Sequence, residues 1–555
     1  MKPKTKTEKV AAKKPAGKRA STTQASTTRA SAGRASAARR SGGGEPARTL
    51  RLHQTSHPVV YEVNARVLLL ELSERAGSSV TLAGIPDEIL DAWAAMGFDA
   101  VWLMGVWSTG PLGRDIARKH EGLQGEYRRV LPDLNPEDIA GSPYSVVSYT
   151  VPRSMGGEAA LRSLREKLAS RGIALILDFV CNHTARDHPW VSSHPEYYIA
   201  GRPGEDVERP DIYFAAKTAE GEKVLAYGRD PTFPGWTDTA QLNYMEPKVR
   251  TAMVAELERI AGLCDGVRCD MAMLLLRYVF ILTWGEQLKQ MEVSAIETEF
   301  WKETIDAIRA KYPRFVFLAE AYWNNEWHLQ QLGFDYTYDK VLYDRLLHEG
   351  ATAVRDHLKA EMDYQRRLVR FTENHDEPRA ARAFGSEGWH FAASMIMACA
   401  PGMTLIHDGQ IEGRTIKLPV QLRRRPAEEV SERTRGFYRQ LLGCLQSAAM
   451  RRGEWHLMNV RPAWHDNATW QNFLVFCWDG KEEGRRMVVV NYAPHNGQCY
   501  VEIPAERLEG TMIEFRDLMS EATFVRDRSG LASKGMYFDL PGYGFHLFEL
   551  KALHS

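Results

Sequence analysis

The stretch Gly266-Val267-Arg268-Cys269-Asp270 places an arginine and an aspartate at the end of a short run that is typical of a buried strand. Side chains two residues apart on a strand point the same way, so Arg268 and Asp270 are expected to share one face. Three further segments put polar residues at the end of an apolar run: Asp178-Phe179-Val180-Cys181-Asn182-His183, Leu318-Ala319-Glu320 and Glu373-Asn374-His375-Asp376. Four such strand ends, separated by helix-length segments, predict a (β/α)8 or TIM barrel whose strands end in an acidic, sugar-sized pocket.

The pattern of apolar residues extends this barrel over residues 56–453. Eight strands are expected, at Val59–Asn64, Asp99–Val106, Ile173–Asp178, Gly266–Asp270, Phe315–Ala319, Phe334–Tyr338, Leu368–Phe371 and Met403–His407. Helices are expected at Pro86–Met96, Gly157–Arg171, Pro247–Gly262, Trp301–Lys311, Asn325–Leu332, Phe391–Ala400 and Glu432–Ala449. The stretch Ser108–Pro143 is rich in Gly, Pro and charge, and it is expected to be a long loop over the barrel.

Two further regions follow from composition. Residues 184–243 have many Pro, Gly, Tyr and His and no long helical pattern, which predicts a subdomain inserted after the third strand. Residues 454–555 contain short β-rich runs separated by Gly, Asn and Pro turns, which predict a C-terminal antiparallel β-sandwich.

The first 55 residues are expected to be a disordered basic tail. Among the first 50 residues, 13 are basic and 2 acidic, which leaves 58 basic and 69 acidic residues and splits a net charge of zero into +11 and −11. The tail has almost no large apolar residue, so it cannot bury enough surface to offset its chain entropy. Two interpretations are open, an arm that binds polyanions and a solvated tail without a specific partner.

Cysteine usage and hydropathy bear on the compartment. The 7 Cys show no paired spacing, which argues against a disulfide framework or a zinc site. No run of about 18 apolar residues is present, so no membrane span is expected. The tail lacks the apolar core of a secretory signal. Together these observations predict a cytoplasmic protein.

The acids at the strand ends suit cleavage of a glycosidic bond. Arg268 beside Asp270 favours an ionised carboxylate, as a nucleophile requires, although an isolated pair of this kind is as often structural. Glu320 is followed by Tyr322 and Trp323, and aromatic surroundings raise the pKa of a carboxyl, which suits a general acid. His375 and Asp376 are adjacent and can bind neighbouring sugar hydroxyls. His183 can do likewise, whereas a lone histidine is more often structural.

These four segments resemble the four conserved regions of the alpha-amylase superfamily, glycoside hydrolase family 13, in order and in residue type. The resemblance covers residues 58–550. It implies that Asp270 is the nucleophile, Glu320 the acid/base and Asp376 the stabiliser of the transition state in a retaining double displacement. Tyr144, in Ser142-Pro143-Tyr144-Ser145, is similar to the family's tyrosine that stacks on the cleaved sugar. The first sugar site would also be shaped by Asp178, Asn182, His183, Arg268 and His375.

The chain departs from typical alpha-amylases after the nucleophile. Met273 and Leu274 stand where those enzymes have Lys and His, which removes a sugar-binding residue and one that helps to hold calcium. Asn182, the other residue on the calcium side, is present. No cofactor is required by this reading, and calcium stays possible through Asn182. Candidate aromatic platforms for sugars, equally interpretable as packing residues, are Trp107, Trp236, Trp323 and Trp327.

The leading hypothesis is therefore a retaining glycoside hydrolase that acts on α-glucosidic bonds of α-glucans or maltooligosaccharides. A transglycosylase or a sugar isomerase on the same scaffold is the first alternative, because the motifs do not decide whether water or a sugar reaches the intermediate. A non-catalytic carbohydrate-binding protein is the second, although this chain keeps all three acids.

Overall fold

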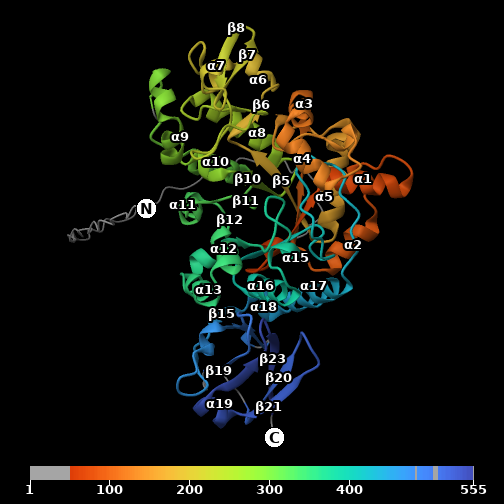
Figure 1. The fold of residues 1–555 in the computed structure, drawn as a ribbon, viewed down its shortest axis with the longest axis vertical. Helices are drawn as coiled ribbons and strands as arrows, with labels where there is room; N and C mark the ends of the chain where they lie inside the picture. Colours follow the sequence, from red (N-terminus) through yellow and green to blue (C-terminus); the bar gives the residue numbers. More distant parts are fainter. Residues whose placement is uncertain (1–49, 295, 482–483, 504–509, 554–555) are drawn as a thin grey trace, which may run out of the picture. The chain divides into compact units, whose positions relative to one another are not determined.

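The computed structural model describes residues 50–294, 296–481, 484–503 and 510–553 (Figure 1). Eight parallel strands close a barrel in the order β1-β14-β13-β12-β11-β10-β5-β2. Their bounds are β1 (Val59–Asn64), β2 (Ala100–Met104), β5 (Ala174–Val180), β10 (Gly266–Asp270), β11 (Val316–Ala319), β12 (Tyr336–Tyr338), β13 (Leu368–Arg370) and β14 (Met403–His407). Each of the eight expected strands is present within a few residues of its predicted bounds.

The barrel interior is filled by every second side chain of these strands. Val60, Trp102, Ile176, Leu318 and Leu405 belong to one buried apolar cluster. Because strand side chains alternate between faces, the next inward position along each strand lies nearer its C-terminal end. There the apolar side chains give way to charged ones.

The first turn of the described chain, η1 (Arg51–His53), corrects the predicted extent of the tail. Leu52 of this turn is 4% exposed and joins the apolar cluster inside the barrel. The backbone N–H of Arg51 donates to Gly172 O at 2.9 Å. Residues 50–55 are therefore part of the fold. The predicted boundary was too late because the basic composition of the preceding residues outweighed the single apolar side chain of Leu52. The remaining part of the predicted tail, residues 1–49, lies outside the described residues.

Helices connect the strands. The helices of the barrel region are α1 (Ala65–Ala76), α2 (Asp87–Ala95), α5 (Gly157–Ser170), α8 (Pro247–Ala261), α9 (Arg277–Gln290), α10 (Phe300–Lys311), α11 (Glu326–Leu332), α12 (Lys340–His348), α13 (Ala351–His357), α14 (Met362–Gln365), α15 (Ala380–Ala383), α16 (Glu387–Cys399), α17 (Glu432–Leu445) and α18 (Ala448–Arg452). The sequence did not predict α9. Its apolar residues do not gather on one face: Phe280 and Trp284 are buried, whereas Leu282 is exposed.

The stretch predicted as a long loop contains two helices, α3 (Pro111–Lys119) and α4 (Glu121–Val130), between the short strands β3 (Ser108–Thr109) and β4 (Val146–Ser148). Pro111 begins α3, a position where its missing N–H costs nothing. Gly113 lies inside the helix, where a Cβ would come within 2.9 Å of Ser145 Oγ. The glycine that suggested a loop is thus needed for close packing of a helix.

The insertion after the third barrel strand is present and is mostly irregular. It contains α6 (Pro189–Ser193), α7 (Glu205–Glu208) and a hairpin of β7 (Tyr213–Thr218) and β8 (Gly221–Ala226). A second pair, β6 (His183–Ala185) with β9 (Thr239–Gln241), ties its two ends together.

The C-terminal region forms a separate antiparallel unit. One sheet has the order β15-β17-β18-β23-β20-β21 and the other the order β16-β19-β22. Their bounds are β15 (Glu454–Leu457), β16 (Val460–Pro462), β17 (Phe473–Asp479), β18 (Arg485–Asn491), β19 (Gly497–Val501), β20 (Met512–Asp517), β21 (Thr523–Asp527), β22 (Met536–Leu540) and β23 (Phe545–Leu553), with the helix α19 (Arg528–Lys534) between β21 and β22. Both sheets contribute to one apolar core, as Val475 and Phe538 show, which makes the predicted sandwich.

Contacts tie this sandwich to the barrel region. Trp478 Nε1 donates to Cys399 O at 2.7 Å, and Tyr492 OH donates to Leu346 O at 2.6 Å. All seven cysteines are free. Within the residues described, no helix combines the length and the apolar character needed to cross a membrane.

Candidate active site

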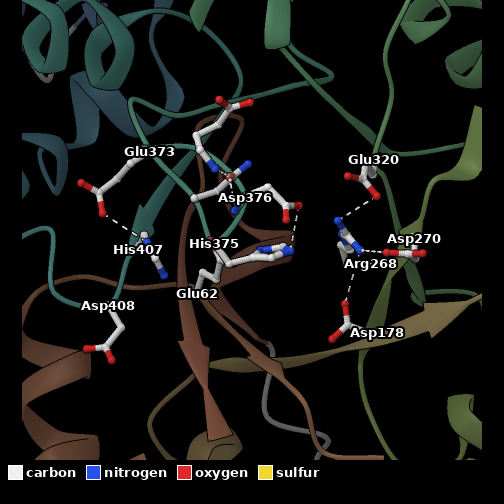
Figure 2. A network of polar contacts seen from close by, with 12 residues as sticks. Glu62, Asp178, Arg268, Asp270, Glu320, Glu373, His375, Asp376, His407 and Asp408 are labelled. Atoms are coloured by element: carbon white, nitrogen blue, oxygen red, sulfur yellow. Dashed lines mark hydrogen bonds and ion pairs between the residues drawn. The ribbon is translucent and has the colours of Figure 1, made fainter. Parts of the chain in front are cut away.

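Arg268 is the centre of a buried charge cluster at the C-terminal end of the barrel (Figure 2). Its backbone register on β10 faces Asp178 of β5 and Leu318 of β11. Arg268 Nη1 lies 2.6 Å from Asp270 Oδ1 and 3.7 Å from Asp178 Oδ1, and Nη2 lies 2.8 Å from Glu320 Oε2. One guanidinium therefore faces three carboxyl groups from three neighbouring strands.

The surroundings of Arg268 are aromatic. The guanidinium lies over the rings of Trp102 and Tyr338, 5.1 and 5.6 Å from their centroids, and 5.4 Å from that of Tyr144. Arg268 itself is fully buried. A cation held between rings and carboxylates in this way keeps its position without water.

Each of the three carboxyl groups around Arg268 has a raised pKa. Burial raises the pKa of Asp178 to about 7 and that of Glu320 to about 7, against the opposing effect of Arg268. Burial also raises the pKa of Asp270, which Arg268 again counters. Arg268 therefore favours the ionised form of Asp270, while burial has the larger effect and leaves its pKa above the ordinary value.

Glu320 is held by two donors besides Arg268. The backbone N–H of Met271 donates to Oε2 at 2.6 Å and Tyr322 OH donates to Oε1 at 2.8 Å. Met271 adopts a left-handed φ of 46°, unusual for a residue with a side chain. This strained residue follows Asp270 directly, so the turn after β10 orients Glu320 as well.

His375 forms a second centre beside the first. Its Nδ1 lies 2.5 Å from Glu62 Oε1, and its Nε2 lies 2.7 Å from Tyr144 OH and 3.0 Å from Asp376 Oδ2. Burial by itself lowers the pKa of His375, but Asp376 and Glu62 outweigh it and raise the pKa to about 10. His375 is accordingly a cation that orients Asp376, as Figure 2 shows.

Asp376 is the most accessible of the expected acids. Its side chain is 45% exposed, whereas Asp270 and Glu320 are buried. Desolvation raises its pKa, but His375, Arg268 and Lys417 together outweigh it and keep the pKa well below its ordinary value. The site thus combines an acid that stays ionised, Asp376, with one that holds a proton near neutral pH, Glu320.

The structure gathers most of the expected site residues in one place. Tyr144, Asp178, Arg268, Asp270, Glu320, His375 and Asp376 are connected by the contacts above. His183 lies at the edge, where Nε2 is 3.2 Å from Tyr144 O. Burial lowers the pKa of His183 to about 4, so its ring is neutral at pH 7.

The four expected aromatic platforms differ in accessibility. Trp107 is only 2% exposed and donates from Nε1 to Asp178 O at 2.7 Å, so it is a structural residue and cannot stack on a sugar. Trp236 is partly buried beside His183. Trp323 and Trp327 keep about half of their surface exposed, at 48% and 49%.

Sequence reasoning missed several residues of the site. Glu62 on β1 is fully buried. The sequence feature that could have revealed it is a carboxyl inside an apolar strand, because buried carboxyl groups are rare unless paired. Tyr338, whose hydroxyl accepts from Arg268 Nε at 3.4 Å, was missed as well. A further cluster joins Glu373 to Arg379 Nη1 at 2.6 Å and to His407 Nδ1 at 3.1 Å.

The calcium expectation rests on Asn182, whose amide is already engaged. Gln241 Nε2 donates to Asn182 Oδ1 at 3.0 Å, and Asn182 Nδ2 donates to Gln241 Oε1 at 3.2 Å. Leu274, which stands in place of the calcium-side histidine, is buried and apolar, as is Met273. Within the described residues no three His, Cys, Asp or Glu side chains are placed to hold a metal ion. Of the three side chains Asn182, Met273 and Leu274, only Asn182 offers an oxygen, and calcium prefers several oxygen ligands.

Comparison with known proteins places the chain in a family. The pattern described as "Alpha amylase, catalytic domain" matches residues 73–434. The chain belongs to the alpha-amylase family. The match begins after β1 and includes all four strand-end segments, with Asp270, Glu320 and Asp376 inside it.

Individual alpha-amylase family proteins are similar over parts of their length. The chain is 25% identical over 367 residues to the alpha-amylase MalA of Haloarcula japonica, which covers 64% of this chain and 44% of that protein. It is 29% identical over 238 residues to a trehalose synthase of a Pimelobacter strain, which covers 39% of this chain and 38% of that protein. The chain thus matches less than half the length of these two relatives.

Solved structures confirm the alpha-amylase fold. A maltogenic alpha-amylase from Thermotoga neapolitana superposes with a TM-score of 0.62 at 18% identity, over 90% of this chain and 99% of that one. At this identity the likeness concerns the fold alone. It includes the C-terminal region as well as the barrel.

Proposed function

We propose that the chain is a retaining glycoside hydrolase that acts on α-glucosidic bonds of α-glucans or maltooligosaccharides. The observation that carries the proposal is the pair of cations, Arg268 and His375, that hold Asp270, Glu320 and Asp376 together at the C-terminal end of the barrel. Family membership supports the substrate class.

The proposed mechanism assigns one role to each acid. Glu320, whose raised pKa keeps a proton available, donates it to the glycosidic oxygen. Asp270 attacks the anomeric carbon as the bond to the leaving sugar breaks, which gives a covalent glycosyl-enzyme. Glu320 then removes a proton from water, which displaces Asp270 and restores the original anomeric configuration. Asp376 stays ionised and stabilises the positive charge on the sugar ring.

Tyr144 and His375 are proposed to hold the sugar that is cleaved. The Tyr144 ring is stacked on His375 at 5.5 Å and is partly exposed. An aromatic face of this kind can cover one side of a pyranose ring, while the His375 imidazolium donates to its hydroxyls.

A second candidate is transfer of the glycosyl group to another sugar, or isomerisation of a disaccharide. The similarity to a trehalose synthase favours it. The same acids would form the same intermediate, and only the acceptor would differ.

A product profile tests both candidates. The full chain is incubated with maltoheptaose, with and without free glucose, and Asp270→Asn serves as the blank. Shorter sugars alone, unchanged by glucose, are expected from a hydrolase, and proton NMR of the first products should show the α anomer. Products longer than the substrate, or labelled glucose incorporated into them, would favour transfer. A first product in the β form would contradict the retaining mechanism, and no turnover of maltoheptaose would point to another glucoside or to a carbohydrate-binding role.

A further inference from the structure

A cavity of about 520 Å³ lies beside α1, α3 and the segment that precedes Tyr144. Four arginines line it, namely Arg66, Arg114, Arg118 and Arg423, and Glu137 is the only acidic residue among the lining. Five serine and threonine residues add hydroxyl groups. None of the candidate catalytic carboxyl groups lines this cavity, so it is distinct from the site described above.

Arg66 is the deepest of the four arginines. Its guanidinium donates to Gly141 O at 2.7 Å and to Thr109 Oγ1 at 3.1 Å, both neutral acceptors. Burial lowers the pKa of Arg66 to about 10, and among the described residues Tyr144, not a carboxylate, opposes this effect. A desolvated cation without a counter-charge is costly, and an anionic ligand would relieve that cost.

The other three arginines are also unmatched in charge within the described part of the chain. Arg118 donates only to Pro136 O, at 2.7 Å, and its buried Nε has no hydrogen-bond partner. Arg423 contrasts with its neighbours in sequence: Arg424 pairs with Asp133 and Asp138, and Arg425 with Glu71 and Asp408. Of three consecutive arginines, the one that lines the cavity forms no ion pair among the described residues, and Asp138 acts on it only at longer range.

We propose that this cavity is a binding site for a small phosphate-bearing ligand. Guanidinium groups match phosphate oxygens with paired, directional hydrogen bonds, and the hydroxyl groups of Ser79, Thr109 and Ser154 can donate to further phosphate oxygens. The volume suits a small molecule and not a polymer. Overall charge does not explain the cluster, because the chain after residue 50 is net acidic, with 58 basic and 69 acidic residues. The proposal is independent of the reaction proposed above.

Pyrophosphate is the probe of choice, because it has no sugar ring and should not enter the candidate active site. Binding to the full chain is measured by titration calorimetry, and the bound region is located by hydrogen–deuterium exchange. The test variant is Arg114→Gln with Arg423→Gln, both exposed and both lining the cavity. The matched control is Arg128→Gln with Arg439→Gln, two exposed arginines away from the cavity lining.

Wild type and control are expected to bind pyrophosphate equally, with slowed exchange in residues 66–80 and 105–118. The test variant should bind at least about tenfold more weakly, which corresponds to the loss of roughly 1.4 kcal/mol, and lose that protection. Equal binding by the test variant, or protection confined to residues 1–49, would overturn the proposal, as would the absence of binding. Wild type, test variant and control variant all contain residues 1–49, so any binding of pyrophosphate to that segment is the same in the three proteins.

Discussion

Two charged clusters lie close together at the C-terminal end of the barrel, and they are built in opposite ways. Around Arg268, one cation faces Asp178, Asp270 and Glu320. Around Glu373, one carboxylate faces two nitrogen groups, Arg379 and His407. In the first cluster burial raises the pKa of every acid, whereas in the second Arg379 and His407 overcome burial and lower the pKa of Glu373.

The difference between the Arg268 and Glu373 clusters shows how burial can serve either chemistry or stability. Both clusters exclude water, so the ratio of acids to cations decides the outcome. Where acids outnumber cations, a proton is retained near neutral pH and can be transferred. Where nitrogen groups surround a carboxylate, as around Glu373, the carboxylate stays ionised and its contacts stabilise the fold. Glu373 lies only three residues before Asp376, so a rigid cluster supports a reactive one.

The largest expected effect is on turnover in the Arg268 cluster. Asp270→Asn removes the nucleophile while keeping its shape, and kcat on maltoheptaose should fall roughly 10⁴-fold. Glu373→Gln, assayed in the same way, should lose far less. Similar losses in both variants would mean that the two clusters act as one unit.

A large effect is also expected for Glu320→Gln, with a loss of about 10²- to 10⁴-fold. The loss should shrink for α-glucosyl fluoride, whose leaving group needs no proton. In the wild type, the pKa of Glu320 near 7 means that its acid form declines above pH 7. The rate should therefore fall on the alkaline side with an apparent pKa near 7, and a flat profile there would contradict a Glu320 acid that titrates near neutral pH.

Stability should respond most strongly to changes in the Glu373 cluster. Glu373→Gln leaves Arg379 without its buried counter-charge, which is expected to cost about 3 kcal/mol of unfolding free energy. Denaturant unfolding of the variant beside Asp270→Asn provides the comparison. A loss no greater than that of Asp270→Asn would contradict the structural role.

The smallest effect is expected for Asp178→Asn, which should raise the thermal stability at pH 7, whereas Glu373→Gln lowers the stability. The pKa of Asp178 is about 7 in the fold against 3.8 as its ordinary value, so the unfolded chain loses this proton first. Wild-type stability therefore declines between about pH 4 and pH 7 through this group. The variant should match the wild type at pH 4 and gain about 2 °C in Tm at pH 7. A lower Tm at pH 7 would show that Arg268 needs this carboxylate.

The sequence was sufficient for the barrel because each strand is a short apolar run that ends in a turn, as at Leu368–Arg370. It was also sufficient to predict the acids at the strand ends. It failed where the local pattern and the tertiary role disagree. Gly113 suggested a loop but permits close packing of α3, and Trp107 suggested a sugar platform but is buried against Asp178. Glu62 is separated from His375 by most of the barrel sequence, so only closure of β1 on β14 brings the two together.

Leu52 has a consequence for how the folding unit is delimited. This one side chain comes from outside the repeating strands and helices, yet it completes the apolar layer at the N-terminal end of the barrel. Its burial contributes about 1.5–3 kcal/mol. A shortened protein that starts at Pro58 would expose that layer to water and invite association of barrels end to end. Any tag or fused partner should therefore be attached before residue 50, so that Leu52 can still cover the apolar layer of the barrel.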